Sequence, residues 1–223
     1  LLVRRVTKSP KWAFFAAALL AVDFMHFTQT RIATIDVFVT FFIILMYYFM
    51  FRYYELDWNE VGLKRTLFPL GMAGVCFGLG AACKWTGIYA GMGLAVILSI
   101  VLFRRVSERR RALKAGDEAA ISRTEGTAKN VVLTLAFCVG AYIVVPAAIY
   151  LLSYLPYFLC AESPYDLQGV WGVQEFMFNY HSKLTATHPY ESGWFTWPLS
   201  IRPIWYYQGK FLPEDVVESI VAF

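Results

Sequence analysis

Long apolar stretches alternate with short charged segments along most of the chain. Five stretches approach the roughly 17–25 residues that a helix needs to cross a bilayer, namely residues 12–27, 35–51, 67–83, 85–103 and 131–152. Thr66 is placed to cap the third stretch, and Pro146 should kink the fifth. The pattern predicts an all-α polytopic membrane protein whose transmembrane bundle covers residues 1–159.

The composition supports a membrane protein over a soluble one. Hydrophobic residues make up 58% of the 223 positions and charged residues only 16%, whereas soluble domains contain about 25% charged residues. The net charge of +4 does not indicate nucleic-acid binding, because eight basic residues lie in the one segment 104–130. Glycines recur in the third and fourth apolar stretches, where they favour close packing between helices.

The basic residues predict the orientation of the bundle. Residues 104–130 hold eight bases and four acids, so we expect a cytoplasmic loop there. The segments 1–11 and 52–66 also carry lysines and arginines and agree with this topology. The predicted location is the cell membrane, with the segments that carry the chemistry on its outer, extracytoplasmic side: residues 28–34, the turn at Lys84, and the chain beyond 154.

The last part of the outer region has its own composition. Residues 160–213 contain four of the seven tryptophans and five of the nine prolines, and we expect them to form a long extracytoplasmic loop. Within this loop an amphipathic helix at the membrane interface is predicted from apolar residues at helical spacing, which are Val170, Val173, Met177, Tyr180 and Leu184. Residues 214–223 are expected to begin a further helix, and both ends of the sequence are interpreted as cuts in a longer protein.

Ionisable residues near two outer turns are the first candidates for a functional site. Asp23 and His26 share one face of the first stretch, and Arg31 and Asp36 flank the connection to the second. Such groups are costly at membrane depth, so they either serve function or form a pair, Arg31 with Asp36 or Asp23 with His26, that locks two helices. Lys84 lies on the side that the positive-inside rule disfavours; it either snorkels to the head groups or binds a lipid phosphate.

A second set of candidates lies in the outer loop between residues 181 and 207. Aromatic residues there fit a membrane-interface belt, but a belt does not require the imidazoles, the carboxylate and the guanidinium that accompany them. The candidates are His181, His188, Tyr190, Glu191, Trp194, Trp197 and Arg202. The spacing of the two histidines does not fit a zinc site, and the four cysteines have no metal-ligand spacing, so no metal is expected.

Three segments in this order resemble the protein O-mannosyltransferases of glycosyltransferase family 39. They are Gln29-Thr-Arg-Ile-Ala-Thr-Ile-Asp36, Cys83-Lys-Trp-Thr-Gly87, and the run from Ala186-Thr-His-Pro-Tyr-Glu-Ser192 through Trp197-Pro-Leu to Arg202-Pro203. The chain looks like a bacterial-type member, because no inserted sugar-binding domain is evident in the outer loop. The resemblance implies a transmembrane bundle of the GT-C type.

The resemblance also implies a reaction. Mannose would pass from a polyprenyl- or dolichyl-phosphate carrier to Ser or Thr hydroxyls of secreted or membrane proteins, with inversion at the sugar. The lipid-linked donor is a substrate, and no cofactor is expected. We assign Asp36 and His188 to catalysis, Arg31, Lys84 and Arg202 to the donor phosphate, and the remaining loop residues, His181, Tyr190, Glu191, Trp194 and Trp197, to the sugar or acceptor.

One part of the family pattern has no counterpart in this sequence. The family carries an acidic pair, taken to include the catalytic base, in an outer loop upstream of the position of Arg31. Residues 1–27 contain a single carboxylate, Asp23, so we expect the base to lie outside this chain and the chain alone to be inactive. Two rival functions stay open: another lipid-phosphate sugar transferase acting on a lipid or wall polymer, and a non-enzymatic transporter.

Overall fold

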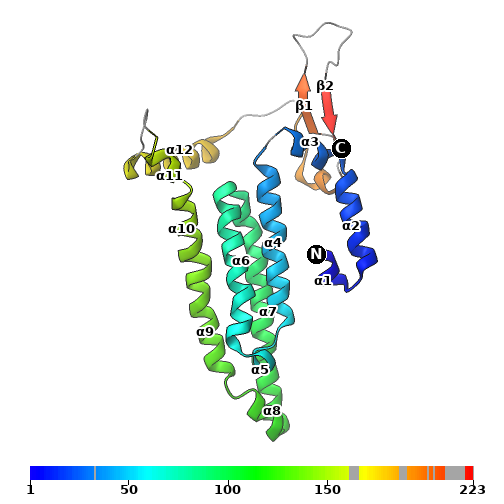
Figure 1. The fold of residues 1–223 in the computed structure, drawn as a ribbon, viewed down its shortest axis with the longest axis vertical. Coiled ribbons are helices and arrows are strands. Elements are labelled where there is room, and N and C mark those ends of the chain that lie inside the picture. The colour runs from blue at the N-terminus through cyan, green and yellow to red at the C-terminus, as the bar shows by residue number, and fades with distance from the viewer. Residues whose placement is uncertain are drawn as a thin grey trace. The chain divides into compact units, whose positions relative to one another are not determined.

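The computed structural model describes residues 1–32, 34–160, 166–185, 190–199, 201–202, 204–208 and 219–222. The chain divides into two compact units (Figure 1). Unit 1 comprises residues 1–16 and 35–155, and unit 2 comprises residues 17–34 and 156–223. Each unit is described by itself below.

Unit 1 is a bundle of long helices. Its elements are α1 (Leu2–Thr7), α4 (Asp36–Glu55), α5 (Trp58–Val61), α6 (Leu63–Cys83), α7 (Thr86–Ala115), α8 (Glu118–Arg123), α9 (Thr127–Val139), the π-helical segment η1 (Gly140–Val144) and α10 (Val145–Leu152). Helix α4 packs mainly on α6, which also contacts α7, α9, η1 and α10. The core of the bundle consists of Met46, Met50, Tyr53, Leu70, Ala73, Cys76, Leu94 and Val101.

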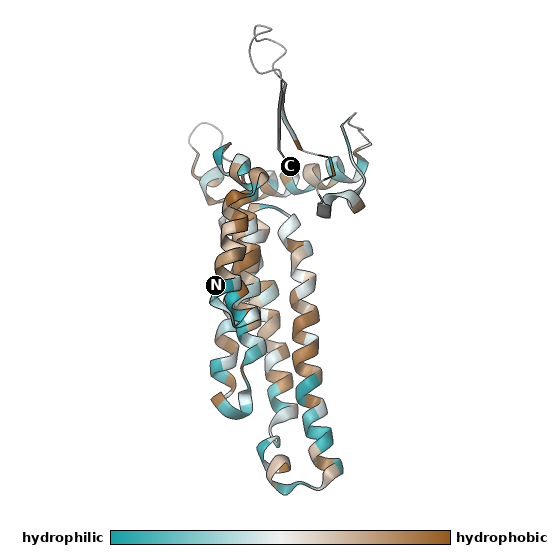
Figure 2. Cartoon of the chain, turned by 90° about the vertical axis from the view of Figure 1, so that its right-hand side faces the viewer, coloured by the Kyte–Doolittle hydropathy of each residue, from teal (hydrophilic) through white to brown (hydrophobic). Residues whose placement is uncertain are grey.

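Four of the predicted spans are confirmed. Helices α4, α6 and α7 and the continuous segment Glu118–Phe158 are each long and apolar enough to cross a membrane. They contain the stretches 35–51, 67–83, 85–103 and 131–152 apart from Ile35 and Trp85, which directly precede α4 and α7. Figure 2 shows apolar residues along the middle of these helices and hydrophilic residues toward one end. The protein is therefore a multi-pass membrane protein with a mostly helical fold.

The first predicted span, residues 12–27, is broken at Asp23. Helix α2 (Pro10–Val22) and helix α3 (Phe24–Arg31) meet at an angle of 59°, so they form either a broken span or a re-entrant segment. The cause is local, because the Asp23 carboxylate accepts a hydrogen bond from the His26 backbone N–H at 2.6 Å and caps α3. Asp23 therefore interacts with the backbone of His26, as the N-cap of α3.

Two further expectations about unit 1 differ from the structure. The predicted basic loop 104–130 is largely helical, because α7 continues to Ala115 and α8 follows it. Good helix formers fill this segment, and α7 ends where Gly116 adopts a left-handed conformation with φ +64°. Thr66 does not cap α6, which begins three residues earlier, and its hydroxyl donates to the Leu63 carbonyl.

The glycines of α6 allow very close helix packing, as the sequence predicted. A methyl group on Gly74 would lie 2.2 Å from the Ala141 carbonyl oxygen, and one on Gly78 would lie 2.9 Å from Pro146 Cα. The chain also forms a π-helical turn, η1, which ends at Val144, two residues before Pro146. A π-helical turn accommodates an irregular stretch of backbone within a helix while keeping its carbonyls bonded.

Unit 2 combines helices with a short hairpin. Besides α3, it contains α12 (Leu167–Lys183), the 3-10 helix η2 (Trp194–Leu199), β1 (Ile204–Gln208) and β2 (Ser219–Ala222), while α11 (Leu155–Phe158) begins at its boundary. Helix α12 confirms the predicted helix, with Val170 buried and Trp171 exposed.

The end of the sequence differs from the expected helix over 214–223. Residues 219–222 form β2, which pairs antiparallel with β1 so that Ile204 lies opposite Ala222 and Trp205 opposite Val221. Ile220 and Val221 are β-branched and favour a strand where a partner strand is present. The sequence pattern alone did not reveal that partner, since it lies well upstream.

Candidate functional site

An ion pair joins the beginning of α4 to the turn between α6 and α7. Asp36 occupies the first turn of α4, and Lys84 follows the last residue of α6. The Lys84 ammonium donates to Asp36 Oδ1 at 2.7 Å, and the two side chains stay 45% and 41% exposed. The structure thus brings together two of the predicted site residues in a contact that a ligand could still reach.

Aromatic side chains also stabilise this turn. Trp85 donates its indole N–H to the Tyr150 hydroxyl at 3.0 Å, and that hydroxyl lies 3.4 Å from the hydroxyl of Tyr154. Gly87, at the start of α7, packs so tightly on α6 that an added methyl would lie 2.8 Å from the Gly80 carbonyl carbon. The backbone that carries Lys84 is therefore held by α6, α7 and the end of α10.

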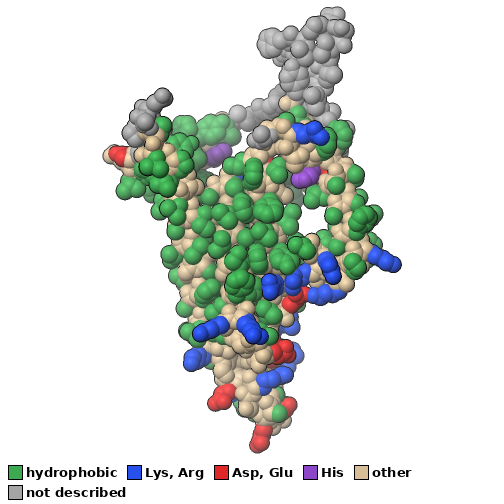
Figure 3. Space-filling model, in the orientation of Figure 1, with side chains coloured by type: hydrophobic (Ala, Val, Ile, Leu, Met, Phe, Trp, Pro, Cys, Tyr) green, Lys and Arg blue, Asp and Glu red, His purple; other side chains and the backbone are tan. Residues whose placement is uncertain are grey.

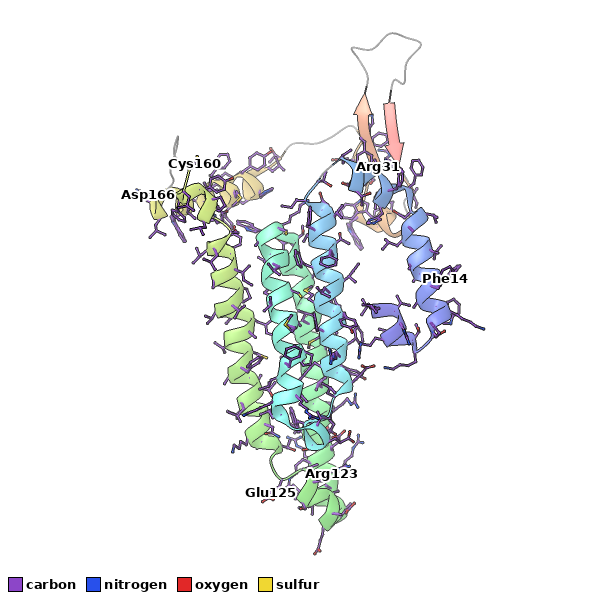
Figure 4. All side chains as sticks on the ribbon, in the orientation of Figure 1. Phe14, Arg31, Arg123, Glu125, Cys160 and Asp166 are labelled. Carbon is purple, nitrogen blue, oxygen red and sulfur yellow. The ribbon has the colours of Figure 1, made fainter. Side chains whose placement is uncertain are left out.

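The opposite end of unit 1 holds most of its charged residues. Figure 3 shows lysines, arginines and acidic side chains gathered there, and Figure 4 labels Arg123 and Glu125 at the α8 end. Arg105 is buried and donates to Asp57 at 2.7 Å and to the Leu56 carbonyl at 2.8 Å. The positive-inside rule predicts that this end is cytoplasmic, and the Asp36–Lys84 pair lies at the opposite, predicted outer end.

In unit 2, Arg202 organises the loop that precedes the hairpin. Its guanidinium donates to the Glu191 carbonyl oxygen at 2.7 Å and lies over the Tyr190 ring, with Cζ 5.0 Å from the ring centroid. Tyr190 in turn meets Trp205 of β1 edge to face at 5.5 Å. The structure therefore brings Tyr190, Glu191 and Arg202 together. One N–H group of Arg202 is used to bind the loop backbone at Glu191.

Arg31 lies at the last residue of α3, which contacts strand β2 (Figure 4). The Arg31 guanidinium stacks on the Phe27 ring with Cζ 4.1 Å from its centroid, and the residue is exposed. In the part of the chain that the structure describes, Arg31 forms no ion pair with a carboxylate. Its charge is thus available to an anionic ligand.

The remaining aromatic candidates of unit 2 stay accessible. Trp194 and Trp197 are 75% and 65% exposed on η2, and the Trp197 indole N–H donates to Ser192. Exposed indole faces of this kind are suitable surfaces for a sugar ring or a lipid. His181 lies in the last turn of α12, edge to face with Tyr180 at 5.3 Å. His188 lies outside the described residues, so its assignment stays a prediction.

The sequence analysis missed two features of this site. The pairing of Asp36 with Lys84 was not anticipated, although both residues were placed at the outer ends of spans, where a lysine gains from a carboxylate neighbour. The hydrogen bond from Trp85 to Tyr150 was also missed, because no local pattern indicates which helix end contacts the Cys83-Lys-Trp turn. Both contacts depend on the packing of helices that are distant in sequence.

Comparisons with known proteins identify relatives over most of the chain. A family model described as dolichyl-phosphate-mannose-protein mannosyltransferase matches residues 1–160. The chain is 26% identical to the polyprenol-phosphate-mannose–protein mannosyltransferase of Mycobacterium tuberculosis (strain H37Rv) over 92% of this chain and 44% of the relative. The similarly named protein of Mycolicibacterium smegmatis is 26% identical over 92% of this chain and 45% of its own length.

A third relative with this name, from Corynebacterium glutamicum, is 24% identical over 96% of this chain and 46% of the relative. The chain thus spans less than half the length of these curated proteins. No solved structure matches it significantly.

Proposed function

Because the chain belongs to the dolichyl-phosphate-mannose–protein mannosyltransferase family, we propose that it takes part in protein O-mannosylation at the outer face of the cell membrane. The donor is a polyprenyl- or dolichyl-phosphate mannose, the acceptor is a Ser or Thr hydroxyl of a protein, and the sugar is inverted. The named relatives support this choice of donor and acceptor. Catalysis needs no cofactor, since the activated sugar arrives on its lipid carrier.

The observation that carries the proposal is the half-exposed Lys84 held by Asp36 at the predicted outer end of unit 1. When mannose leaves its carrier, the phosphate gains negative charge, and a fixed cation stabilises that charge. An exposed ion pair contributes little to folding, so the Lys84 ammonium can bind a lipid phosphate beside the Asp36 carboxylate at small cost. Lys84 thereby binds the departing phosphate.

Asp36 is assigned a positioning role rather than proton abstraction. Its Oδ1 accepts a hydrogen bond from the Lys84 ammonium at 2.7 Å, so this carboxylate already holds the cation in place. Arg31 adds a second cation for the phosphate. Tyr190, Glu191, Trp194, Trp197 and His181 stay candidates for sugar or acceptor contacts, His188 stays a candidate for catalysis, and Arg202 both orders the loop and presents positive charge.

The test is mannosyl transfer by the full-length protein in membranes, from labelled polyprenyl-phosphate mannose to a Ser/Thr peptide, because this chain alone is expected to be inactive. Arg31→Ala and Lys84→Ala should each lower transfer by about 100-fold or more, because each removes charge stabilisation from the leaving phosphate. Lys114→Ala, at the far end of α7, is the matched control and should leave transfer unchanged. Near-normal transfer by both site variants would refute the phosphate assignment.

The same assay separates the rival reaction. Consumption of the donor without labelling of the peptide, but with labelling of a lipid or wall polymer, would indicate a different acceptor class. A substrate-stimulated ion flux in vesicles would instead indicate a transporter.

A further inference from the structure

A groove on the surface of unit 1, away from the Asp36–Lys84 pair, lies between α6 and the α9–η1–α10 segment. This groove has a volume of about 660 Å³ and is lined by one face of α6 from Lys64 to Val75 and by side chains within residues 136–145. We call it the α6–α9 groove. Figure 1 shows the two helical segments that form its walls side by side.

Small residues hollow out this groove. Gly71 leaves room for the Phe137 ring, whose Cζ would lie 3.0 Å from a methyl group placed on Gly71. Gly140 begins the π-helical turn, and a methyl group there would meet no atom within 4 Å, so the space beside it is open. The groove is thus built into the helix pair and can be filled by substitution at Gly140.

The length and chemistry of the groove match one leaflet of a bilayer. Lys64 and Val75 are eleven residues apart on α6, which corresponds to about 16 Å along the helix axis. The hydrocarbon core of a membrane is about 30 Å thick, so the groove extends from one surface to about the midplane. Apart from Lys64, every side chain that lines it is apolar.

Lys64 places a positive charge at the membrane-surface end of the groove. Its side chain is exposed, and it forms no ion pair with any carboxylate in the described part of the chain. Lys8 and Arg105 at this end pair with Glu55 and Asp57, whereas Lys64 lines the groove with its charge still available to an anionic group. An unpaired lysine at the mouth of an apolar groove complements a molecule with an anionic head and a hydrocarbon tail.

We propose that the α6–α9 groove binds one anionic glycerophospholipid of the leaflet that the positive-inside rule identifies as cytoplasmic. One acyl chain lies along α6 between Phe68 and Val75, and the head-group phosphate contacts the Lys64 ammonium. An apolar helix in the same groove would leave Lys64 without an anionic partner. This site is separate from the proposed transfer reaction, and neither proposal depends on the other.

A photo-reactive benzoylphenylalanine at Phe68 tests the identity of the occupant. Phe68 lines the groove and is 60% exposed, whereas Phe103 on α7 is 72% exposed and does not line it. The protein is reconstituted in equal parts phosphatidylglycerol and phosphatidylcholine, extracted, washed extensively with detergent and then illuminated. We expect phosphatidylglycerol adducts at position 68 and almost none at 103, where loosely held lipid is removed.

Two substitutions extend the test to the head group and the tail. Lys64→Gln should lower the yield of phosphatidylglycerol adducts about fivefold, and Arg65→Gln, which changes an exposed neighbour outside the groove, should not. Gly140→Leu should remove the adducts while the protein stays folded, since its side chain enters open space.

Three results would overturn the proposal. The first is an adduct of position 68 with another protein segment or a second copy of the protein in place of lipid. The second is equal amounts of lipid adduct at positions 68 and 103. The third is an equal yield of phosphatidylglycerol adduct from Lys64→Gln and Arg65→Gln.

Discussion

The two ends of unit 1 each carry an ion pair between distant helices, but the pairs differ in burial. At the predicted inner end, Arg105 and Asp57 have side chains 7% and 19% exposed, and Arg105 also bonds the Leu56 carbonyl and Glu108. At the predicted outer end, Lys84 and Asp36 are 45% and 41% exposed. The Lys84 ammonium has no second ion-pair or hydrogen-bond partner in the described part of the chain.

Because of this difference in burial, the inner pair can act as a structural contact and the outer pair as a contact that a ligand can reach. Removing one partner of a buried pair leaves the other charge without solvation, so the protein loses much stability. An exposed pair is solvated whether or not it forms, and measured contributions are about 0–1 kcal/mol. The inner pair therefore holds α5 and α7 together, and the outer pair leaves Lys84 accessible to a phosphate while Asp36 positions it.

The largest expected effect comes from breaking the inner pair. Arg105→Ala leaves Asp57 and the Leu56 carbonyl without their partner, and we expect the free energy of unfolding to fall by about 3 kcal/mol. The measurement is the unfolding midpoint of the purified protein in mixed micelles. Arg104→Ala is the control, because Arg104 is exposed, stacks on Tyr54 and forms no ion pair in the described part of the chain, so its loss should cost under about 1 kcal/mol. Equal losses for the two variants would contradict the assigned roles.

The next effect concerns the outer pair and is seen in activity. Asp36→Asn should lower mannosyl transfer about tenfold, because Lys84 loses the carboxylate that orients it, while the unfolding midpoint changes little. The charge-swapped protein with Asp36→Lys and Lys84→Asp should keep its stability but show almost no transfer, since the cation has moved to α4. Normal transfer by Asp36→Asn would show that Lys84 needs no positioning partner.

A smaller effect is expected from the aromatic support of the Lys84 turn. Trp85→Phe keeps an aromatic ring but removes the indole N–H that donates to Tyr150. A single neutral hydrogen bond contributes about 1 kcal/mol, so we expect a loss of stability of that size and at most about a fivefold loss of transfer. Trp12→Phe, an exposed position on α2, serves as the control and should change neither quantity. A stronger effect at Trp12 than at Trp85 would contradict this assignment.

The smallest effect tests whether charge alone suffices at position 84. Lys84→Arg keeps the positive charge at an exposed position, and both cations bind phosphate, so transfer should stay within about threefold of the original rate. The rate should be compared with that of Lys84→Gln, which has a similar length without the charge. If arginine and glutamine lower transfer equally, charge is not what position 84 contributes.

Much of the fold could be predicted because membrane spans are a local property. The apolar stretch 35–51 predicts α4 without reference to any other helix, and the glycines of α6 predict a face for close packing. The break at Asp23 also has a local cause. The sequence analysis treated the Asp23 carboxylate as an intramembrane ionisable group, whereas in the structure it caps α3. The hairpin of β1 and β2 could not be predicted, because neither strand sequence indicates which other segment it pairs with.

The candidate site was predicted residue by residue but not as a set of contacts. Lys84 and Asp36 were selected for their charge and predicted depth, yet each could have paired with several residues. Tyr190, Glu191 and Arg202 were selected from one loop, where the structure shows Arg202 bound to the Glu191 carbonyl. His188 and the hairpin connection lie outside the described residues and stay predictions.

The sequence by itself determined the membrane-spanning character and the predicted orientation of the bundle, because the transfer of apolar side chains into lipid and the bias of basic residues act on each segment alone. Only the tertiary structure decided which carboxylate Lys84 binds and how deeply each ion pair is buried. It also decided where the α6–α9 groove runs. These features depend on which helices pack together, and hydropathy does not specify packing because lipid and neighbouring helices are equally apolar.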